Sequence, residues 1–281
     1  DQRDLHLSLR RQRQMCIRDR DRHRSMEEYV RAKMRLFENQ TKDDIAVLNA
    51  LDDTVASAPT LARRYYFANV PIDSPGCFFS EGWLVCRTKS GKLRRVMKDE
   101  EVPLLGLHNR MNVAACATVG MVMRIAPDVI RAGIMGFRGL PHRMEFVKEW
   151  RGVMFYNNSM CTNPRAFVCS VSAFGEKVIV IAGGRIKNTG LHPIVDAIVE
   201  WAKGAVLIGE SAESIAQELK AKGYTSFKIA DSMECAVLLA KGMAHSGDKV
   251  ILAPGGASFD WYTNFAERGE DFKRIVEALD E

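Results

Sequence analysis

The sequence predicts an α/β protein, in which helices cover a mostly parallel sheet. From Gly152 onward, five short apolar segments alternate with five segments of helical periodicity. The apolar segments are rich in β-branched residues and almost uninterrupted, as expected of strands that are covered on both faces. Each helical segment provides the crossover that a parallel strand requires. The predicted strand-then-helix pairs are 152–158 with 163–174, 177–184 with 192–202, 205–210 with 211–223, 226–230 with 232–244, and 248–258 with 264–279.

Residues typical of helix ends support these boundaries. Ser211, with Ser214, and Ser232 stand where helices are expected to begin, and serine side chains can accept a hydrogen bond from the first turn of a helix. Gly223 and Gly242 stand where helices are expected to end. We assign residues 140–281 to one Rossmann-like domain with a mostly parallel sheet.

The preceding residues, 21–139, predict the C-terminal part of a second α/β domain. Residues 26–38 have the pattern of an amphipathic helix, and residues 43–53 that of a strand ending in a turn. Short strands separated by glycine-containing turns follow between Arg64 and Val96, which predicts an antiparallel meander. Two helices close this part, 108–125 and 127–137, the second beginning at a favourable proline.

The charge and the cysteines exclude several classes of function. Residues 1–24 carry eight Arg and four Asp, so this segment supplies +4 of the total +5. Since the rest is nearly neutral, no nucleic-acid surface is expected. Residues 1–20 fit neither a signal nor a transit peptide, and we interpret them as artefactual sequence or a disordered arm.

The seven cysteines are scattered without metal-binding spacing, which favours reduced thiols in a cytoplasmic protein. No apolar run reaches the ~18–20 residues of a membrane span. We therefore expect a cytoplasmic monomer that does not insert into a membrane.

In an open parallel sheet, ligands gather at the carboxyl ends of the strands. Polar groups and glycines stand at these ends, although such residues also occur in ordinary loops. The segments are Asn157–Ser159, Gly183–Lys187, Gly209–Glu210, Asp231–Ser232 and Pro254–Ser258. A cation, hydroxyls and backbone amides on one rim suit a ligand that carries a carboxylate. None of the ends carries the GxGxxG pattern, which argues against a nicotinamide-dependent oxidoreductase.

Several longer segments resemble, in order and spacing, signatures of the ATP-dependent Mur ligases. The resemblance is strongest to the members that add D-glutamate to UDP-N-acetylmuramoyl-L-alanine, and it covers residues 21–281. It rests on EEYVRAKMRLFENQ, AVLNALDD, LGLHNRMNVAA, GFRGLPHRMEFV, NNSMCTNP, VIVIAGG-x-x-K and APGGASFDWYTNFAERGEDF. The resemblance implies an enzyme of peptidoglycan precursor synthesis. Such an enzyme uses ATP and Mg²⁺ to activate the alanine carboxylate as an acyl phosphate, which an amino acid then attacks to form an amide.

The resemblance also implies roles for residues of the ATP site. Lys33 matches the lysine that is carbamylated and supports a magnesium ion; without the resemblance, it would be a surface lysine. Asn109 and Asn112, three apart on one helix, match residues that face the adenine, and would otherwise suggest a helix cap. Arg143 and Asn158 match positions that contact the nucleotide. His142, beside Arg143, is expected to be structural.

For the amino-acid site, the resemblance implies four residues that hold the incoming substrate. Lys187 would pair with a carboxylate, Thr162 and Ser258 would donate hydrogen bonds, and Phe265 would complete the pocket. An isolated serine or phenylalanine at these positions would usually be a cap and a core contact.

The sequence departs from the family at this pocket. Asn158 and Met160 stand where the family has aspartate and lysine, Ile186 stands where an acidic residue is usual, and Gly255–Gly256 replaces an Ala–Cys pair. A charge-assisted hydrogen bond contributes about 1.5–3 kcal/mol, so the missing lysine would lower glutamate affinity roughly ten- to a hundredfold unless Arg165 or Arg185 replaces it. The departures predict a divergent member that takes D-glutamate, a related amino acid or another stereoisomer.

The 281 residues contain no GxxxxGK[ST] phosphate loop. We therefore expect no ligase activity from this polypeptide by itself. The alternative is a non-catalytic or partner-dependent Mur-like protein that binds a nucleotide or an amino acid. A scaffold protein would not need the glycine, lysine and serine residues at the strand ends.

Overall fold

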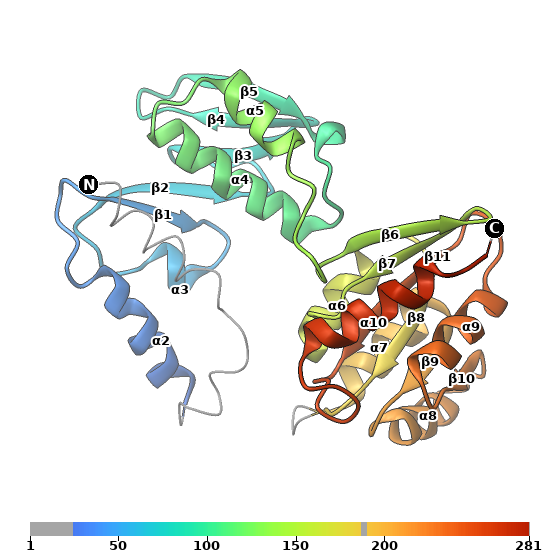
Figure 1. Ribbon diagram of the computed structural model, residues 1–281. Helices are drawn as coiled ribbons and strands as arrows, with labels where there is room; N and C mark the ends of the chain where they lie inside the picture. The colour runs from blue at the N-terminus through green and yellow to red at the C-terminus, as the bar shows by residue number, and fades with distance from the viewer. Residues whose placement is uncertain (1–24, 187–189, 281) are drawn as a thin grey trace. The chain divides into compact units, whose positions relative to one another are not determined.

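The computed structural model describes residues 25–186 and 190–280, which form two compact units (Figure 1). The N-terminal unit comprises the residues up to Pro103 together with Asn109–Phe137, and the C-terminal unit comprises Leu104–His108 and the residues from Arg138 onward. The expectation for residues 1–20 lies outside the described residues. Among the described residues, none of the helices combines the length and the apolar character needed to cross a membrane.

The N-terminal unit contains a five-stranded sheet in sequential order. Its strands are β1 (Ile45–Asn49), β2 (Arg63–Ala68), β3 (Gly76–Ser80), β4 (Trp83–Arg87) and β5 (Leu93–Lys98). β2 pairs in parallel with both β1 and β3, whereas β3, β4 and β5 pair antiparallel. The predicted antiparallel meander is therefore wrong for β2, because the 69–75 segment returns the chain to the same end of the sheet before β3 begins.

The three longer helices of the N-terminal unit lie where periodicity predicts them. They are α2 (Met26–Met34), which the 3₁₀ turn η2 (Arg35–Phe37) follows, α4 (Leu107–Val122) and α5 (Pro127–Met135). The short α3 (Asp53–Ala56) and the 3₁₀ turn η3 (Asp99–Glu101), which precedes α4, are additions. Ser25 caps α2 by accepting the Glu28 N–H, and Pro127 occupies the first turn of α5, as expected. Apolar residues of α4 and α5 pack with those of β3, β4 and β5 in one core cluster.

One expectation about the cysteines is wrong. Cys77 and Cys86 are directly opposite each other on β3 and β4 and form a disulfide. The spacing of the cysteines in the sequence did not indicate this pair, because only the register of β3 and β4 brings the two residues together. Both are buried in the core beneath α4.

The C-terminal unit contains a six-stranded sheet in the order β10-β9-β8-β11-β7-β6. Its strands are β6 (Glu145–Trp150), β7 (Val153–Asn157), β8 (Val178–Gly183), β9 (Ala202–Ile208), β10 (Phe227–Ile229) and β11 (Lys249–Gly255). All pairs are parallel except β6 with β7, which a hairpin at Arg151–Gly152 connects. The five predicted strand-then-helix pairs are confirmed, and the antiparallel edge strand β6 is an addition.

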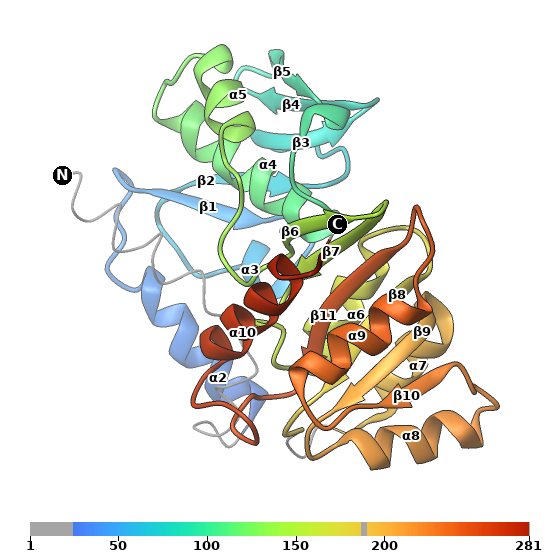
Figure 2. The same cartoon turned by 45° about the vertical axis from the view of Figure 1, so that its right-hand side comes forward.

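Helices cover both faces of this sheet (Figures 1 and 2). They are α6 (Pro164–Ser172), α7 (His192–Trp201), α8 (Ala212–Ala221), α9 (Met233–Met243) and α10 (Phe265–Glu277). The crossovers from β7 through β10 all run in one direction, so right-handed connections place α6, α7 and α8 on one face. The return from β10 to β11 places α9, with α10, on the other face.

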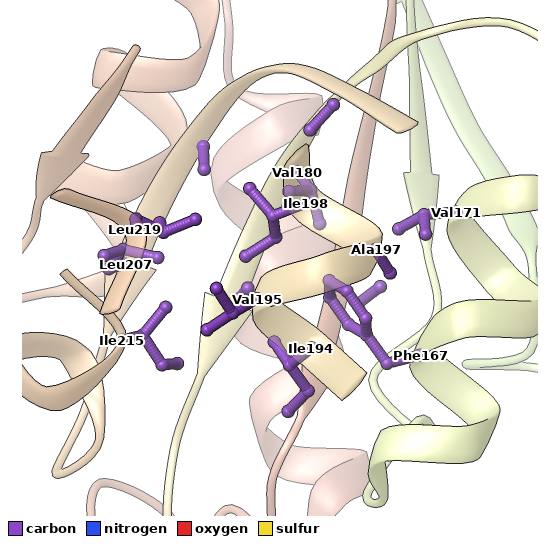
Figure 3. Close-up of a cluster of buried hydrophobic side chains, with 14 of the residues drawn as sticks. Phe167, Val171, Val180, Ile194, Val195, Ala197, Ile198, Leu207, Ile215 and Leu219 are labelled. Atoms are coloured by element: carbon purple, nitrogen blue, oxygen red, sulfur yellow. The ribbon is translucent and has the colours of Figure 1, made fainter. Parts of the chain in front are cut away.

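The core clusters show why the strands are apolar throughout. Alternate residues of β8 pack on opposite sides, Val180 toward α7 and Ile181 toward α9 and α10. Figure 3 shows the first cluster, in which Phe167 of α6, Ile194 and Ile198 of α7 and residues of α8 pack together. Ser232 caps α9 as predicted, whereas Gly242 lies inside that helix and does not end it.

Candidate functional site

The carboxyl ends of β7, β11 and β8 meet along one edge of the C-terminal sheet, because the three strands are parallel neighbours. The loops beyond these ends are tied together through their backbones. Gly255 donates its N–H to the Cys161 carbonyl at 2.9 Å, and Arg185 and Ala257 exchange two N–H···O bonds of 2.9 Å each. Two strand-end segments predicted to face a ligand, the one with Thr162 and the one with Ser258, are thereby held beside each other.

Arg143 lies on an exposed turn that precedes β6. The residues on either side adopt left-handed backbone conformations, with φ of 63° at His142 and 50° at Met144. Such conformations are uncommon outside glycine and persist only where surrounding contacts hold them. Here the His142 N–H donates to Glu145 Oε2 at 2.8 Å, and the His142 carbonyl accepts the Met160 N–H at 3.0 Å.

Asn158 is buried and is one of the residues that hold this turn. Its Oδ1 accepts the Met144 N–H at 3.2 Å, and its Nδ2 donates to Ser170 Oγ on α6 at 2.6 Å. Both ends of the amide are therefore occupied by protein partners. The side chain connects the Arg143 turn to α6, which a sequence comparison could not reveal.

His142 is structural, as the sequence suggested. Its ring is buried, with Nδ1 3.0 Å from Asn157 Nδ2, and it makes an edge contact with the Phe265 ring at a centroid distance of 6.1 Å. Asn157 Nδ2 also donates to Glu145 Oε2 at 3.1 Å. Burial by itself raises the pKa of Glu145. Hydrogen bonds from the His142 N–H and the Lys273 ammonium lower the pKa by more than burial raises it, so the pKa of Glu145 is below its ordinary value.

The residues predicted to bind the amino-acid substrate, at the rim formed by the carboxyl ends of β7, β11 and β8, differ in their exposure to solvent. Thr162 is exposed just before Asn163, whose side chain caps α6. Ser258 is almost fully buried, and its carbonyl accepts the Tyr262 N–H at 2.8 Å. Phe265 is half-buried at the start of α10, and its carbonyl accepts the Ser159 hydroxyl at 2.7 Å. Met160, where the family resemblance implies a lysine, is 41% exposed.

The glycine pair Gly183–Gly184 at the end of β8 allows the loop after β8 to lie close to the loop after β11. Gly184 has a φ of 103°, and a Cβ there would lie 2.6 Å from the Ala257 carbonyl oxygen. Glycine is therefore required at position 184 because the backbone there lies against the backbone of the loop after β11. Arg185 faces Glu210 in a two-point ion pair, with Nε to Oε2 at 3.0 Å and Nη2 to Oε1 at 2.5 Å. Lys187, the predicted carboxylate partner, lies outside the described residues.

The predicted ATP-site residues of the N-terminal unit lie on two helices. Asn109 and Asn112 share one face of α4, where Asn112 Nδ2 donates to Asn109 Oδ1 at 3.2 Å. Lys33 lies in the last turn of α2, with its ammonium 5.4 Å from the centre of the Tyr29 ring. Across residues 25–186 and 190–280, no three His, Cys, Asp or Glu side chains gather in a way that could hold a metal ion.

Sequence reasoning missed Arg268 of α10. Its side chain is 1% exposed and contacts the ends of both β7 and β11. The charge pattern of α10 gave no sign of this, because an arginine in a helix with several charged residues normally faces solvent.

Comparisons with known proteins agree with this architecture. The profile of the Mur ligase middle domain matches residues 20–120, and that of the Mur ligase glutamate ligase domain matches residues 142–256. The chain belongs to the Mur ligase family. Its two units correspond to these two Mur ligase domains.

Curated relatives include UDP-N-acetylmuramoylalanine–D-glutamate ligases. The protein from Pelotomaculum thermopropionicum is 36% identical over 261 residues, which cover 92% of this chain and 57% of the relative. The protein from Aquifex aeolicus is 33% identical over 258 residues, covering 92% of this chain and 59% of the relative. This Mur ligase chain thus spans less than two thirds of the length of these relatives.

Solved structures support the Mur ligase fold. The chain superimposes on a UDP-N-acetylmuramoylalanyl-D-glutamyl-2,6-diaminopimelate–D-alanyl-D-alanyl ligase from Acinetobacter baumannii with a TM-score of 0.63 and 17% identity, covering 89% of this chain and 55% of that one. It superimposes on the MurF ligase of Thermotoga maritima, solved with ADP, with a TM-score of 0.60 and 17% identity, covering 90% and 58%.

Proposed function

We propose that this chain is the nucleotide-facing and amino-acid-binding part of an ATP-dependent ligase that adds D-glutamate, or a related amino acid, to UDP-N-acetylmuramoyl-L-alanine in the cytoplasm. The observation that carries the proposal is the rim that joins Thr162, Ser258 and Phe265. Three separate segments of the sequence bring a hydroxyl, a backbone-tied loop and an aromatic ring to the same edge. The identity of 33–37% with D-glutamate ligases supports the substrate class.

In the proposed reaction, the alanine carboxylate attacks the γ-phosphorus of ATP, and ADP leaves. The amine of the incoming amino acid then attacks the acyl carbon, loses a proton and expels phosphate, which leaves an amide. Catalysis of this kind depends on positioning and on neutralising charge. Within this chain, Thr162, Ser258 and Lys187 would orient the carboxylates of the amino acid, and Phe265 would shield the site from water.

For the nucleotide, we propose that Asn109 and Asn112 face the adenine edge and that Arg143 faces the ribose and phosphates. Asn158 would act through the Arg143 turn, because both ends of its amide already have protein partners. The described residues offer no acidic cluster that fits Mg²⁺ by itself. Lys33 would supply one oxygen donor as a carbamate, and hard oxygen donors suit this ion.

Titration of the isotope-labelled chain with D-glutamate, L-glutamate and other amino acids would test the amino-acid site. We expect D-glutamate to shift the amide resonances of Thr162, Ser258 and Phe265 more than the other amino acids do. If a different amino acid shifts them more strongly, the pocket has diverged in specificity. If no amino acid shifts them, the amino-acid site is not here.

The alternative is a Mur-like protein that binds its ligands without forming an amide. The departure at Met160 favours it, because one cation of the pocket is replaced by an uncharged side chain. Expression of the whole reading frame that contains this sequence, followed by assays of phosphate release, would decide between the two. Amide formation by the 281-residue chain alone would contradict our expectation that a phosphate loop is needed.

A further inference from the structure

Arg268 is a buried cation at the centre of the rim. It lies in the first turns of α10, and its side chain is among the largest that are fully buried. Burial lowers the pKa of Arg268 to about 10, so it still carries its charge at neutral pH. Among the described residues, no carboxylate lies within ion-pair distance of it. Burying a charge without an ion pair costs several kcal/mol, so the contacts that it makes must offset this cost.

Those contacts are made with two strand ends. Nε donates to Ser159 Oγ at 3.0 Å, and Nη2 donates to the Ser159 carbonyl at 2.9 Å and to the Gly256 carbonyl at 3.1 Å. Ser159 follows β7 and Gly256 follows β11. The guanidinium therefore fastens α10 to both loops at once.

A third strand end lies against the remaining nitrogen. Nη1 has no hydrogen-bond partner among the described residues, and it faces Gly184, where a Cβ would lie 3.2 Å away. Gly184 directly follows β8. The ends of β7, β11 and β8 thus surround a single guanidinium.

We propose that Arg268 is a positioning residue that sets the spacing of the amino-acid pocket. The inference rests on the proposed function, since the pocket is the one assigned there. Ser159 stands three residues before Thr162, and Gly256 stands two residues before Ser258. Phe265 begins the helix that carries Arg268, and its carbonyl accepts the Ser159 hydroxyl. Each of the three pocket segments is therefore fixed by contacts that converge on Arg268 and Ser159.

The positioning role has an electrostatic consequence. With Met160 in place of the family lysine, the rim has one fewer solvent-facing cation, and Arg185 is paired with Glu210. Arg268 adds a buried positive charge beside the loops, which its electrostatic interaction with the Asp260 carboxylate partly balances. This charge favours a carboxylate at the rim without contacting it, since interactions inside a protein are screened less than those at its surface.

Hydrogen exchange of the whole 281-residue chain tests the positioning role without a substrate. Arg268→Met removes the guanidinium and keeps an unbranched apolar stem, which is shorter than that of arginine. We expect the amides of Arg185, Gly255 and Ala257, which bond across the loops, to exchange about ten- to a hundredfold faster, as the loss of charge-assisted bonds implies. The amides of Ala205 and Ala230, at β9 and β10, should keep their rates. Arg274→Met is the matched control, because Arg274 is an exposed arginine of the same helix.

Two outcomes would overturn the proposal. The first is a rim that exchanges as slowly in Arg268→Met as in the unmodified chain. The second is an equal acceleration of all amides of the C-terminal unit, which would make Arg268 an ordinary core residue. If Arg268→Met does not fold, the Nε–H of Arg268 in the unmodified chain decides. It should exchange at least about a hundredfold more slowly than that of Arg274, and equal rates would contradict the proposal.

Measurement of the affinity for D-glutamate tests whether Arg268 acts on the amino-acid pocket. We expect Arg268→Met to weaken D-glutamate binding at least about tenfold, Arg268→Lys to restore part of the loss, and Arg274→Met to leave binding unchanged. Unaltered binding in Arg268→Met would refute a role in the pocket. If the unmodified chain binds no amino acid, the proposed function fails, and the exchange rates still decide whether Arg268 holds the three strand ends together.

Discussion

The imidazole of His142 packs directly onto the backbone of Gly269, so that a Cβ at position 269 would overlap the ring. Gly269 is buried inside α10, where a glycine normally destabilises a helix by about 1 kcal/mol relative to alanine. The glycine lets the ring approach α10 and reach Asn157. The Arg143 turn is fixed to α10 through this contact.

We therefore expect Gly269→Ala to destabilise the C-terminal unit by about 1–3 kcal/mol, in spite of the better helix propensity of alanine. Gly242→Ala is the matched control, because Gly242 also lies inside a helix, α9, and a Cβ added there would meet no atom within 4 Å. It should leave stability unchanged or raise it by up to about 1 kcal/mol. Urea unfolding measures both, and equal effects would show that the His142 contact is unimportant.

Met160→Lys introduces the cation that the family resemblance implies at this position. Because Met160 is 41% exposed on the rim, a lysine fits without burial of its charge. We expect the affinity for D-glutamate to rise about ten- to a hundredfold, as measured by titration calorimetry. Met123→Lys, at a similarly exposed methionine of the N-terminal unit, should have no effect. An unchanged affinity in Met160→Lys would mean that the carboxylates bind elsewhere.

Glu101 gives the N-terminal unit an acid-sensitive contact. A hydrogen bond from Arg131, followed by the Lys98 N–H, lowers the pKa of Glu101 from 4.5 to about 2. Between pH 4.5 and about 2, Glu101 binds a proton more readily in the unfolded chain than in the folded chain. The contribution to stability is therefore complete above pH 4.5 and is lost as the pH falls toward 2.

Arg131→Met should lower the urea midpoint of the N-terminal unit at pH 7 and have little effect near pH 2. Hydrogen exchange of the α5 backbone amides reports the stability of the N-terminal unit separately from that of the C-terminal unit. Arg94→Met, at an exposed arginine of β5, is the control and should show no such pH dependence. A difference between Arg131→Met and the unmodified chain that persists at pH 2 would rule out the Glu101 pair as its source.

The cysteines should differ widely in reactivity. Burial raises the pKa of Cys161 from 9.0 to about 11, which reduces its thiolate fraction about a hundredfold at neutral pH. Cys169 is exposed. Peptide mapping after maleimide treatment should show rapid labelling of Cys169 and slow labelling of Cys161, with Cys77 and Cys86 labelled only after reduction. Equal rates at Cys161 and Cys169 would contradict the burial of Cys161.

Local patterns in the sequence were sufficient for most of the elements. The apolar runs of β8 and β11, the periodicity of the helices between them, the cap at Ser232 and the first-turn proline Pro127 depend on residues close together in the chain. The physical rules that connect such patterns with strands and helices are local as well. The alternation of the two elements then determined a parallel sheet and the edge at which its loops meet.

The direction of β2 and the Cys77–Cys86 disulfide were decided by strand pairing, which is not local. The same holds for the side chains of the rim. Asn158 was expected to face a nucleotide, yet its amide holds the Arg143 turn. The sequence could show which residue types stand at the strand ends, but not the direction in which each side chain points.

Arg268 shows this limit most clearly. By composition it is one more charged residue in a charged helix, and its sequence neighbours Glu267 and Glu270 are exposed. Its burial follows from the meeting of three strand ends that are up to 109 residues from it along the chain. The sequence by itself determined the fold class and the family, because both depend on local order. The tertiary structure decided which side chains hold the pocket together, because hydrogen bonds to buried carbonyls form only after the distant strand ends have met.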